Sequence, residues 1–482
     1  MAFNSFEYLL FLPLVAALFY LTPRPYRWVL LLSASYVFYS AWRLDYLLLL
    51  LLSTAVDYVA ALRIHALEQP NQRKRWLMLS VGVNLGLLMG FKYLEPALSG
   101  LNELAGLSGA AWALPVPEIL LPIGISFYTF QTLSYTIDVY RGVSQPERHL
   151  GRFALYVAFF PQLVSGPIER STTLLPQFRQ HQVLDVQGIS DALKLILWGF
   201  FLKLVVADRL ALQVDAVFHE PEGQHGAVVL ASVYLFAFQV FFDFAGYTNI
   251  AIGSAKLMGF DLMENFARPY LARSIPEFWQ RWHMSLTSWI RDYVYFSMGG
   301  SRVGWWRRWF NLYVVFFLVA MWHGTDWKLA LFGTTHFLLY VLTKALAGPM
   351  QALLQTMGLA KQTWLVNAMS IALTFTLVSF CWVIWWAPSF GHVVTIYQGA
   401  FDWQQGLPSA SDWPTSLADL ALITSLLAFC AVISLLQGDR PQRRLLMHQS
   451  PVLRWSVLYL LVLALLFLRP EQGGDAFIYF QF

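Results

Sequence analysis

The sequence predicts an all-α polytopic integral membrane protein, and three features of its composition support this fold class. Of its 482 residues, 57% are hydrophobic and only 12% are charged, whereas about a quarter of the residues of a soluble chain are charged. Its 20 Trp, 22 Tyr and 38 Phe residues suit a lipid-facing surface and the headgroup level of a bilayer. The net charge of +4 is spread thinly, which argues against a nucleic-acid-binding protein.

The apolar runs are long and numerous enough for roughly 11–13 membrane spans. A hydrocarbon core about 30 Å thick needs roughly 20 apolar residues per helix. Runs that approach this length lie at 5–21, 28–43, 46–62, 77–92, 119–137, 153–168, 192–207, 227–250, 309–322, 327–344, 364–386, 417–436 and 453–468. Gly and Pro interrupt several of them, notably at Leu121–Gly124 and Phe160–Pro167. Irregular backbone at membrane depth needs protein or a water-filled cavity around it, so we expect re-entrant segments around a central tunnel.

Short loops rich in Arg and Lys indicate the orientation, because such loops stay on the cytoplasmic side of a membrane. The clearest are Arg24–Arg27, Arg63–Arg75, Arg302–Arg308 and Arg440–Arg444. Placing all four in the cytoplasm puts the N-terminus outside. It also puts the C-terminal tail, Arg469–Phe482, on the extracytoplasmic side.

We expect a single membrane-embedded domain over the whole chain, because no internal repeat, low-complexity tract or long linker divides it. Within this domain we distinguish four parts. They are N-terminal spans (1–118), a core that carries the candidate site (119–344), C-terminal spans (345–468) and an aromatic tail (469–482).

The stretch Phe241–Gly300 mixes charged and aromatic residues too densely for a lipid-facing helix. Within it, Ile275–Met298 is typical of an amphipathic or re-entrant element. Arg291 in this element can serve as an interfacial anchor or line a polar space. Asp243 follows the apolar run Val228–Phe242, where an ionised carboxylate needs a partner.

His323 ends an apolar helix that begins after Arg308. Trp309–Trp322 spans about 21 Å as a helix, which is shorter than the hydrocarbon core, so His323 is expected to lie within the membrane nearer its outer face. A lone membrane histidine is often a packing residue. A histidine between Trp322 and Gly324, at a helix break, also has room for a substrate beside it.

His336 lies on nearly the opposite helical face from His323 and is expected to be structural. No pair of histidines has the spacing of metal ligands, so no metal site is predicted.

Six blocks of sequence resemble bacterial members of the membrane-bound O-acyltransferase family, specifically the membrane subunits that acetylate exported polysaccharides such as alginate. The blocks are LPIGISFYTFQTLSYTIDVYRG (121–142), FFPQLVSGPIER (159–170), WGFFLKLVVADRL (198–210), FFDFAGYTNIAIGSAKLMGF (241–260), ENFARPYLARSIPEFWQRWHMSLTSWIRDYVYFSMGG (264–300) and MWHGTDW (321–327). The resemblance covers most of the chain. It implies the family's helical core and a place in the cell inner membrane.

The resemblance also implies roles for individual residues. The invariant-type histidine of such enzymes falls on His323, and a second histidine that lines the same tunnel falls on His283. Further candidates for the tunnel lining are Trp322, Trp282, Asp243 and Arg291. Asn249 departs from the aspartate expected at its position, which argues against a charge-based role there.

The chain ends FIYFQF, which is similar to an F-x-Y-x-x-F ending on small partner proteins of related teichoic-acid D-alanylation systems. There the tyrosine is thought to hold the acyl group in transit. The likeness makes Tyr479 the candidate acyl relay. The alternative is an aromatic anchor at the membrane interface.

The resemblance implies acetyl-CoA, or another acyl thioester, as donor and no bound cofactor. In the predicted mechanism, His323 acts as general base while a hydroxyl attacks the thioester. The acetyl group would then leave Tyr479 for an extracytoplasmic SGNH-type acetyltransferase partner that modifies the polysaccharide.

Two other functions stay open at this point. The first is D-alanyl transfer to teichoic acid within the same family, in which the tyrosine normally sits on a separate partner. The second is a non-enzymatic transporter or flippase, since broken helices and polar groups at membrane depth are typical of transporters. A transporter predicts inverted repeats, which we do not find in the sequence.

Overall fold

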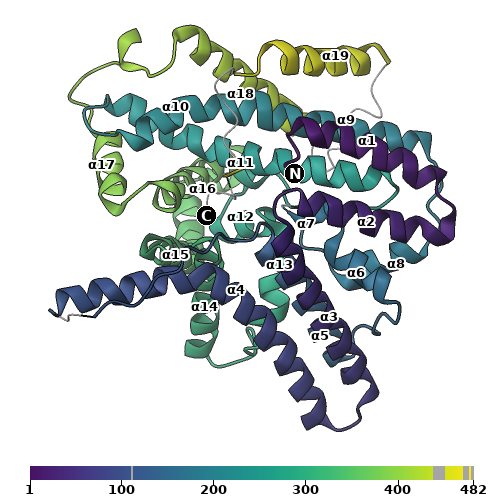
Figure 1. Cartoon of the computed structure of the whole chain (residues 1–482). Coiled ribbons are helices and arrows are strands. Elements are labelled where there is room, and N and C mark those ends of the chain that lie inside the picture. Colours follow the sequence, from purple (N-terminus) through teal and green to yellow (C-terminus); the bar gives the residue numbers. More distant parts are fainter. Residues whose placement is uncertain (110–111, 165, 438–450, 471–476, 479–482) are drawn as a thin grey trace. The chain divides into compact units, whose positions relative to one another are not determined.

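The structure is a computed structural model, and every regular element in the part it describes is a helix (Figure 1). The predicted all-α class is therefore confirmed. The described residues are 1–109, 112–164, 166–437, 451–470 and 477–478.

Six of the described helices are long and apolar enough to cross a membrane, judged by length and composition. They are Leu44–Ala66, Pro70–Leu107, Gly226–Leu257, Trp327–Thr356, Thr363–Trp386 and Leu417–Leu436. Two shorter apolar helices, Phe6–Leu21 and Arg454–Phe467, add to them. The chain is thus a multi-pass membrane protein. Other predicted spans are divided: 153–168 contains two short helices, and 192–207 continues from an α-helix into a π-helix.

The helices group into two compact units. Unit 1 comprises residues 1–193 and 251–263, and unit 2 comprises residues 194–250 and 264–482. Helices α9 and α11 each contribute residues to both units.

Unit 1 contains the N-terminal helices. They are α1 (Phe6–Leu21), η1 (Arg24–Tyr26), α2 (Arg27–Ser40), α3 (Leu44–Ala66), α4 (Pro70–Leu107), α5 (Ile125–Arg141), α6 (Leu150–Ala158), α7 (Phe160–Leu163), α8 (Ser171–Arg179) and the first part of α9 (Val186–Phe200). Figure 1 shows α4 bent along its length, and Pro96 lies inside this helix. A proline there removes a backbone hydrogen bond and bends the helix.

A buried carboxylate joins three helices of unit 1. Asp57 of α3 accepts hydrogen bonds from Ser80 and Asn84 of α4 and from Thr136 of α5. The Asn84 and Thr136 donors lie 2.8 and 3.0 Å from its oxygens. Buried polar groups are costly unless they are paired, so these contacts hold the three helices in one register.

The interruption predicted at Leu121–Gly124 is confirmed, because α5 begins only at Ile125. Gly124 precedes it with a φ of 77°, in the left-handed region that favours glycine. A Cβ atom at this position would lie within 2.4 Å of the carbonyl oxygen of Leu163, so close packing also requires glycine here.

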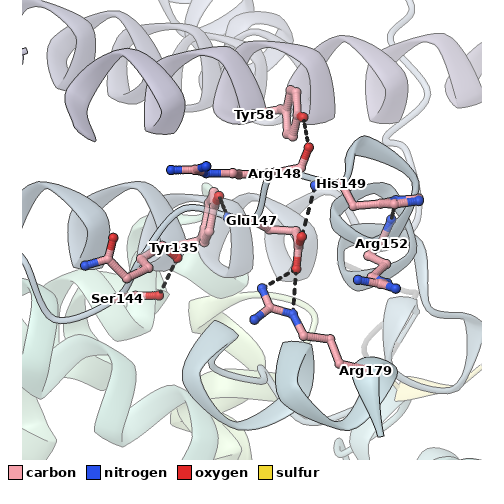
Figure 2. Close-up of polar contacts among 9 residues, drawn as sticks. Tyr58, Tyr135, Ser144, Glu147, Arg148, His149, Arg152 and Arg179 are labelled. Carbon is pink, nitrogen blue, oxygen red and sulfur yellow. Dashed lines mark hydrogen bonds and ion pairs between the residues drawn. The ribbon is translucent and has the colours of Figure 1, made fainter. Parts of the chain in front are cut away.

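Polar contacts hold the segment that leads into α6 (Figure 2). The buried carboxylate of Glu147 accepts a hydrogen bond from Nε of Arg179 at 3.0 Å and one from the backbone N–H of His149 at 2.9 Å. The backbone N–H of Glu147 donates to the hydroxyl of Tyr135 at 2.9 Å. Glu147 therefore links α5, α8 and the start of α6 within unit 1.

Unit 2 contains the remaining helices. They are η2 (Phe201–Ala207), α10 (Asp208–His219), α11 (Gly226–Leu257), η3 (Pro269–Leu271), α12 (Ile275–Arg281), α13 (Met284–Ile290), η4 (Arg291–Tyr295), α14 (Trp305–His323), α15 (Trp327–Thr356), η5 (Leu359–Lys361), α16 (Thr363–Trp386), α17 (Phe390–Ala400), η6 (Ala410–Asp412), α18 (Leu417–Gln437) and α19 (Pro451–Phe467). Elements η2 and η4 are π-helices, a rare form that is frequent at functional sites.

Two glycines allow the backbones of α9 and α11 to pack closely against each other in unit 2. A Cβ atom on Gly199 would lie 2.7 Å from the carbonyl oxygen of Gly246, and one on Gly246 would lie 2.8 Å from that of Gly199. The Cβ atom on Gly246 would also lie 3.0 Å from the backbone nitrogen of Lys203. The nearest obstructing atom at each position is a backbone carbonyl oxygen, so a side chain at either position forces the helices apart.

We expect Gly246→Ala to lower the free energy of unfolding by about 1–3 kcal/mol, because its methyl group meets backbone atoms. The control is Gly82→Ala in α4, where a Cβ atom meets nothing within 4 Å. That change should be neutral or stabilising by about 0.5–1 kcal/mol. Thermal unfolding in lipid nanodiscs measures both. A Gly246→Ala protein as stable as the wild type would contradict the close approach of the two helices.

Candidate active site

His323 is the last residue of α14, and the next helix, α15, begins at Trp327. The predicted helix break after His323 is therefore confirmed. Helix α14 is longer than expected, since it begins at Trp305 inside the predicted loop Arg302–Arg308. The first turn of the helix thus carries the basic residues, and its apolar remainder ends at the histidine.

His283 lies in the break between α12 and α13. The predicted element Ile275–Met298 thus contains three short helices, because η4 follows α13 directly. Its backbone has a φ of 43°, an uncommon conformation for a residue other than glycine. Asn265 supports this bend: its carbonyl oxygen accepts from Met284 N–H at 2.9 Å, and its side-chain oxygen accepts from Ser285 N–H at 3.3 Å. Strained backbone held in this way is typical of active sites.

Both candidate histidines contact the indole ring of Trp322. The ring of Trp322 lies 5.9 Å from that of His283 and 4.8 Å from that of His323, measured between ring centroids. All three side chains are buried. His283 and His323 come from different helix breaks, forty residues apart in the sequence, yet they share this neighbour.

Tryptophans enclose this group. Trp282 lies 4.9 Å from Trp382, which lies 5.5 Å from Trp385, and Trp385 in turn lies 5.5 Å from His323 in an edge-to-face arrangement. Trp382 and Trp385 belong to α16. An aromatic enclosure excludes water, which strengthens electrostatic interactions inside it and protects a reactive acyl group from hydrolysis.

The described part of the C-terminal tail lies in the same unit. The ring of Phe477 is fully buried, at 0% exposure, and stacks on Tyr247 at 4.2 Å with an interplanar angle of 28°. It also lies 5.6 Å from Phe244, whose ring meets His283 edge-on at 4.8 Å. Tyr479, the predicted acyl relay, lies outside the described residues.

Asp243 has the partner that its burial requires. Lys203 Nζ lies 2.5 Å from Asp243 Oδ1 and 2.8 Å from Asp208 Oδ1. The second oxygen of Asp243, Oδ2, accepts a hydrogen bond from the backbone N–H of Ile478 at 2.9 Å. Sequence reasoning did not single out Lys203. The signal was a lysine inside a predicted span, since an ionisable residue at membrane depth is a functional candidate by default.

The structure does not bring Arg291 to the two histidines. It opens η4, its side chain is 58% exposed, and its Nε pairs with the adjacent carboxylate of Asp292 at 2.8 Å.

His336 is buried in an aromatic cluster on the far side of Trp382 from Trp385, and its ring lies 6.5 Å from that of Trp382. Its Nδ1 lies 3.3 Å from Nε1 of Trp279, and its ring meets Phe332 edge-on at 4.7 Å and Phe278 nearly parallel at 6.4 Å. These contacts describe a packed side chain that holds α15 against α12.

A cavity of about 830 Å³ lies one aromatic layer away from His283 in unit 2. Its walls come from α11, α16, α18 and the segment 264–271 and are mostly apolar, and the charged residues Glu264, Arg268 and Arg281 also line it. Phe266 lines the cavity and also contacts Phe244, the neighbour of His283, at 5.1 Å. In the part of the chain that the structure describes, no group of three or more His, Cys, Asp or Glu side chains could hold a metal ion.

Comparison with known proteins shows the family to which the chain belongs. The model of the membrane-bound O-acyltransferase family matches residues 149–383, which include both histidines. The probable alginate O-acetylase of Pseudomonas putida is 35% identical, over 100% of both chains. The protein of the same name from Pseudomonas aeruginosa is 38% identical over 88% of this chain and 78% of its own. The peptidoglycan O-acetyltransferase of Helicobacter pylori is 31% identical over 78% of this chain and 73% of its own. The chain is therefore a member of the membrane-bound O-acyltransferase family.

Proposed function

We propose that this acyltransferase takes an acetyl group from cytoplasmic acetyl-CoA and delivers it through the inner membrane for O-acetylation of an exported polysaccharide such as alginate. The acetyl group travels on Tyr479 and passes to an SGNH-type partner outside. Relatives that match most of the chain support this proposal, because their names describe O-acetylation of alginate and peptidoglycan. The arginine-rich loops support an orientation with both termini outside.

The observation that carries the proposal is the burial of Phe477 and Ile478, the described residues before Tyr479, near His283. Phe477 and Ile478 are 0% and 4% exposed. An aromatic anchor at the interface would leave these side chains among lipid headgroups instead. A buried Phe477 that is separated from His283 by the single ring of Phe244 suits an acyl acceptor better than an anchor.

The chemistry needs one base and one acceptor. As the phenol oxygen of Tyr479 attacks the thioester carbonyl carbon, the imidazole of His323 takes the phenol proton. A C–O bond forms, the C–S bond breaks, and the imidazolium returns the proton to the departing thiolate. His283 lines the acceptor side, since its ring contacts Phe244, on which the tail packs.

A phenol is a suitable carrier for an acetyl group that must be passed on. The pKa of a phenol is near 10 and that of a thiol near 8.5, so the two are leaving groups of similar quality. An aryl acetate therefore keeps most of the reactivity of the thioester. A serine hydroxyl of the partner can attack it, and the phenol regains its proton.

The cavity beside the site has the size and chemistry for the donor. Its apolar walls suit the pantetheine arm, and the guanidinium groups of Arg268 and Arg281 suit the phosphates of coenzyme A. Phe266, which lines the cavity, contacts Phe244 and so lies close to the acceptor side of the site.

The direct test uses isotopically labelled acetyl-CoA with the purified protein in lipid, followed by mass spectrometry of the C-terminal peptide. We expect label on Tyr479 and none on the Tyr479→Phe protein, because phenylalanine has no nucleophilic oxygen. Label that reaches a polysaccharide or partner from the Tyr479→Phe protein would contradict the relay. A tail acylated from a D-alanyl carrier thioester but not from acetyl-CoA would favour the D-alanyl alternative. Substrate movement without any acyl transfer would favour a transporter.

His323→Ala should lower the rate of Tyr479 acetylation by about 10²–10⁴-fold, the usual contribution of a general base. The control is His336→Gln, which keeps a hydrogen-bond acceptor for Trp279. The ring of His336 contacts Phe278, Phe332 and Trp382, none of which belongs to the tail. Its rate should stay within about threefold of the wild type, although its melting temperature should fall. Single-turnover labelling of monodisperse protein measures both rates. A His323→Ala rate close to that of the wild type would remove the histidine from the mechanism.

Ala372→Trp should raise the KM for acetyl-CoA by about tenfold or more, because an indole fills part of the cavity that Ala372 lines. Leu373→Trp is the matched control on the same helix, since its side chain is 58% exposed and does not line the cavity. Initial rates at varied acetyl-CoA give both constants. Equal KM values for the two variants would show that the donor binds elsewhere.

A further inference from the structure

One face of α11 contacts the C-terminal segment at three points. Asp243 and Tyr247 lie one helical turn apart and therefore share a face. Tyr247 stacks on Phe477, Phe244 also contacts Phe477, and Asp243 Oδ2 accepts the backbone N–H of Ile478. Helix α11 thus contacts two features of the segment, the aromatic ring of Phe477 and the main-chain N–H of Ile478.

The carboxylate that accepts this hydrogen bond belongs to a buried group of three charges. The side chains of Lys203, Asp208 and Asp243 are only 5%, 6% and 4% exposed. One ammonium faces two carboxylates, so the group carries a formal net charge of −1. Burying such a charge is costly unless hydrogen-bond donors meet the remaining oxygens, and the Ile478 N–H meets one of them.

Local structure on both helices brings Lys203 to Asp243. Lys203 lies in the π-helix η2, and Gly246, one turn beyond Asp243, allows the backbone of α11 to approach that of Lys203. Contacts outside the tail therefore hold Asp243 in place. A hydrogen bond between a fixed carboxylate and a main-chain N–H selects a register, because a slip by one residue presents a different side chain to the ring of Tyr247.

A second contact holds Leu468, the residue that precedes the tail. Arg209, adjacent to Asp208 in α10, donates from Nη2 to the carbonyl oxygen of Leu468 at 2.7 Å, and its Nη1 pairs with Asp419 at 2.5 Å. The tail is thus attached at Leu468 and again at Ile478, the residue that precedes the proposed acyl acceptor.

We propose that Asp243, Phe244 and Tyr247 form a binding site for the chain's own C-terminal segment, with Asp243 as the positioning residue that sets the register of Tyr479. This inference rests on the proposed role of Tyr479 as acyl acceptor. Lys203 orients the carboxylate, and Asp243 acts through the tail rather than on the acetyl group. The peptide bound at this site supplies a buried aromatic residue, Phe477, and a main-chain N–H donor on the next residue, Ile478.

The test compares Asp243→Leu with Asp208→Leu in the full-length protein in lipid nanodiscs. Each change removes one carboxylate and leaves Lys203 with one partner, so the remaining charges balance. Asp243 accepts the hydrogen bond from Ile478, whereas Asp208 interacts with the tail through the charge of Arg469 at its start. Hydrogen exchange with fragmentation of the C-terminal peptide reports protection of the Ile478 amide. We expect Asp243→Leu to lower that protection at least about tenfold and Asp208→Leu to preserve it, since a hydrogen bond to a charged partner contributes about 10- to 100-fold.

Acetylation kinetics distinguish a positioning role of Asp243 from a purely structural one. We expect Asp243→Leu to lower kcat for Tyr479 acetylation by about 10- to 100-fold while the KM for acetyl-CoA stays within about twofold. A rise in KM with an unchanged kcat would overturn the positioning role, and so would an Ile478 amide that stays protected in Asp243→Leu.

A second variant keeps the test valid if Asp243→Leu does not fold. Ile478→Pro removes the N–H donor and leaves Asp243, Lys203 and Asp208 unchanged, and Ile478→Val controls for the side chain. We expect the proline variant to reproduce the loss of kcat and the valine variant to behave as the wild type. The double variant Asp243→Leu/Ile478→Pro should lose no more than either single variant, because both remove the same contact.

The results separate this inference from the proposed function. If wild-type Tyr479 never carries label, the relay fails whatever the exchange data show. If Tyr479 is labelled at the same rate in wild type, Asp243→Leu and Ile478→Pro, the relay stands and the positioning role of Asp243 is overturned.

Discussion

The buried ammonium of Lys203 is the interaction on which the candidate active site depends. It neutralises part of the charge of Asp208 and Asp243 in surroundings where unpaired carboxylates would be too costly to keep ionised. Because Asp243 is held in this way, one of its oxygens can face the C-terminal segment. The close approach of α9 and α11, which Gly199 and Gly246 permit, is the backbone condition for this arrangement.

The site is built from helix ends rather than from continuous helices. His323 ends α14 and His283 occupies the break between α12 and α13. Side chains at such ends can turn toward one another, and both histidines reach Trp322. In a lipid solvent this irregular backbone needs a protein cover, and the tryptophans of α16 supply part of it. The same cover keeps water from an activated acyl group.

Much of the fold could be predicted from the sequence, because the apolar runs and the Gly and Pro interruptions are local signals. The helix break after His323 and the irregular segment before Ile125 lie where the pattern indicated. Helix α14 begins earlier than expected, because hydropathy ends a span at the first basic residue whereas backbone hydrogen bonding continues through it. Hydropathy likewise did not reveal that the runs at 153–168 and 192–207 are divided.

Composition and local pattern by themselves determined that this protein is a helical membrane protein with a helix break after His323, since hydropathy and helix breaks depend on neighbours along the chain. The role predicted for His283 came from the family resemblance. They also showed that Asp243 needs a partner. Only the tertiary structure decided which partner it has, where Phe477 and Ile478 lie and which residues line the cavity. Asp243 lies forty residues from Lys203 and 235 residues from Ile478 in the sequence, and contacts over such separations are set by helix packing and not by local periodicity.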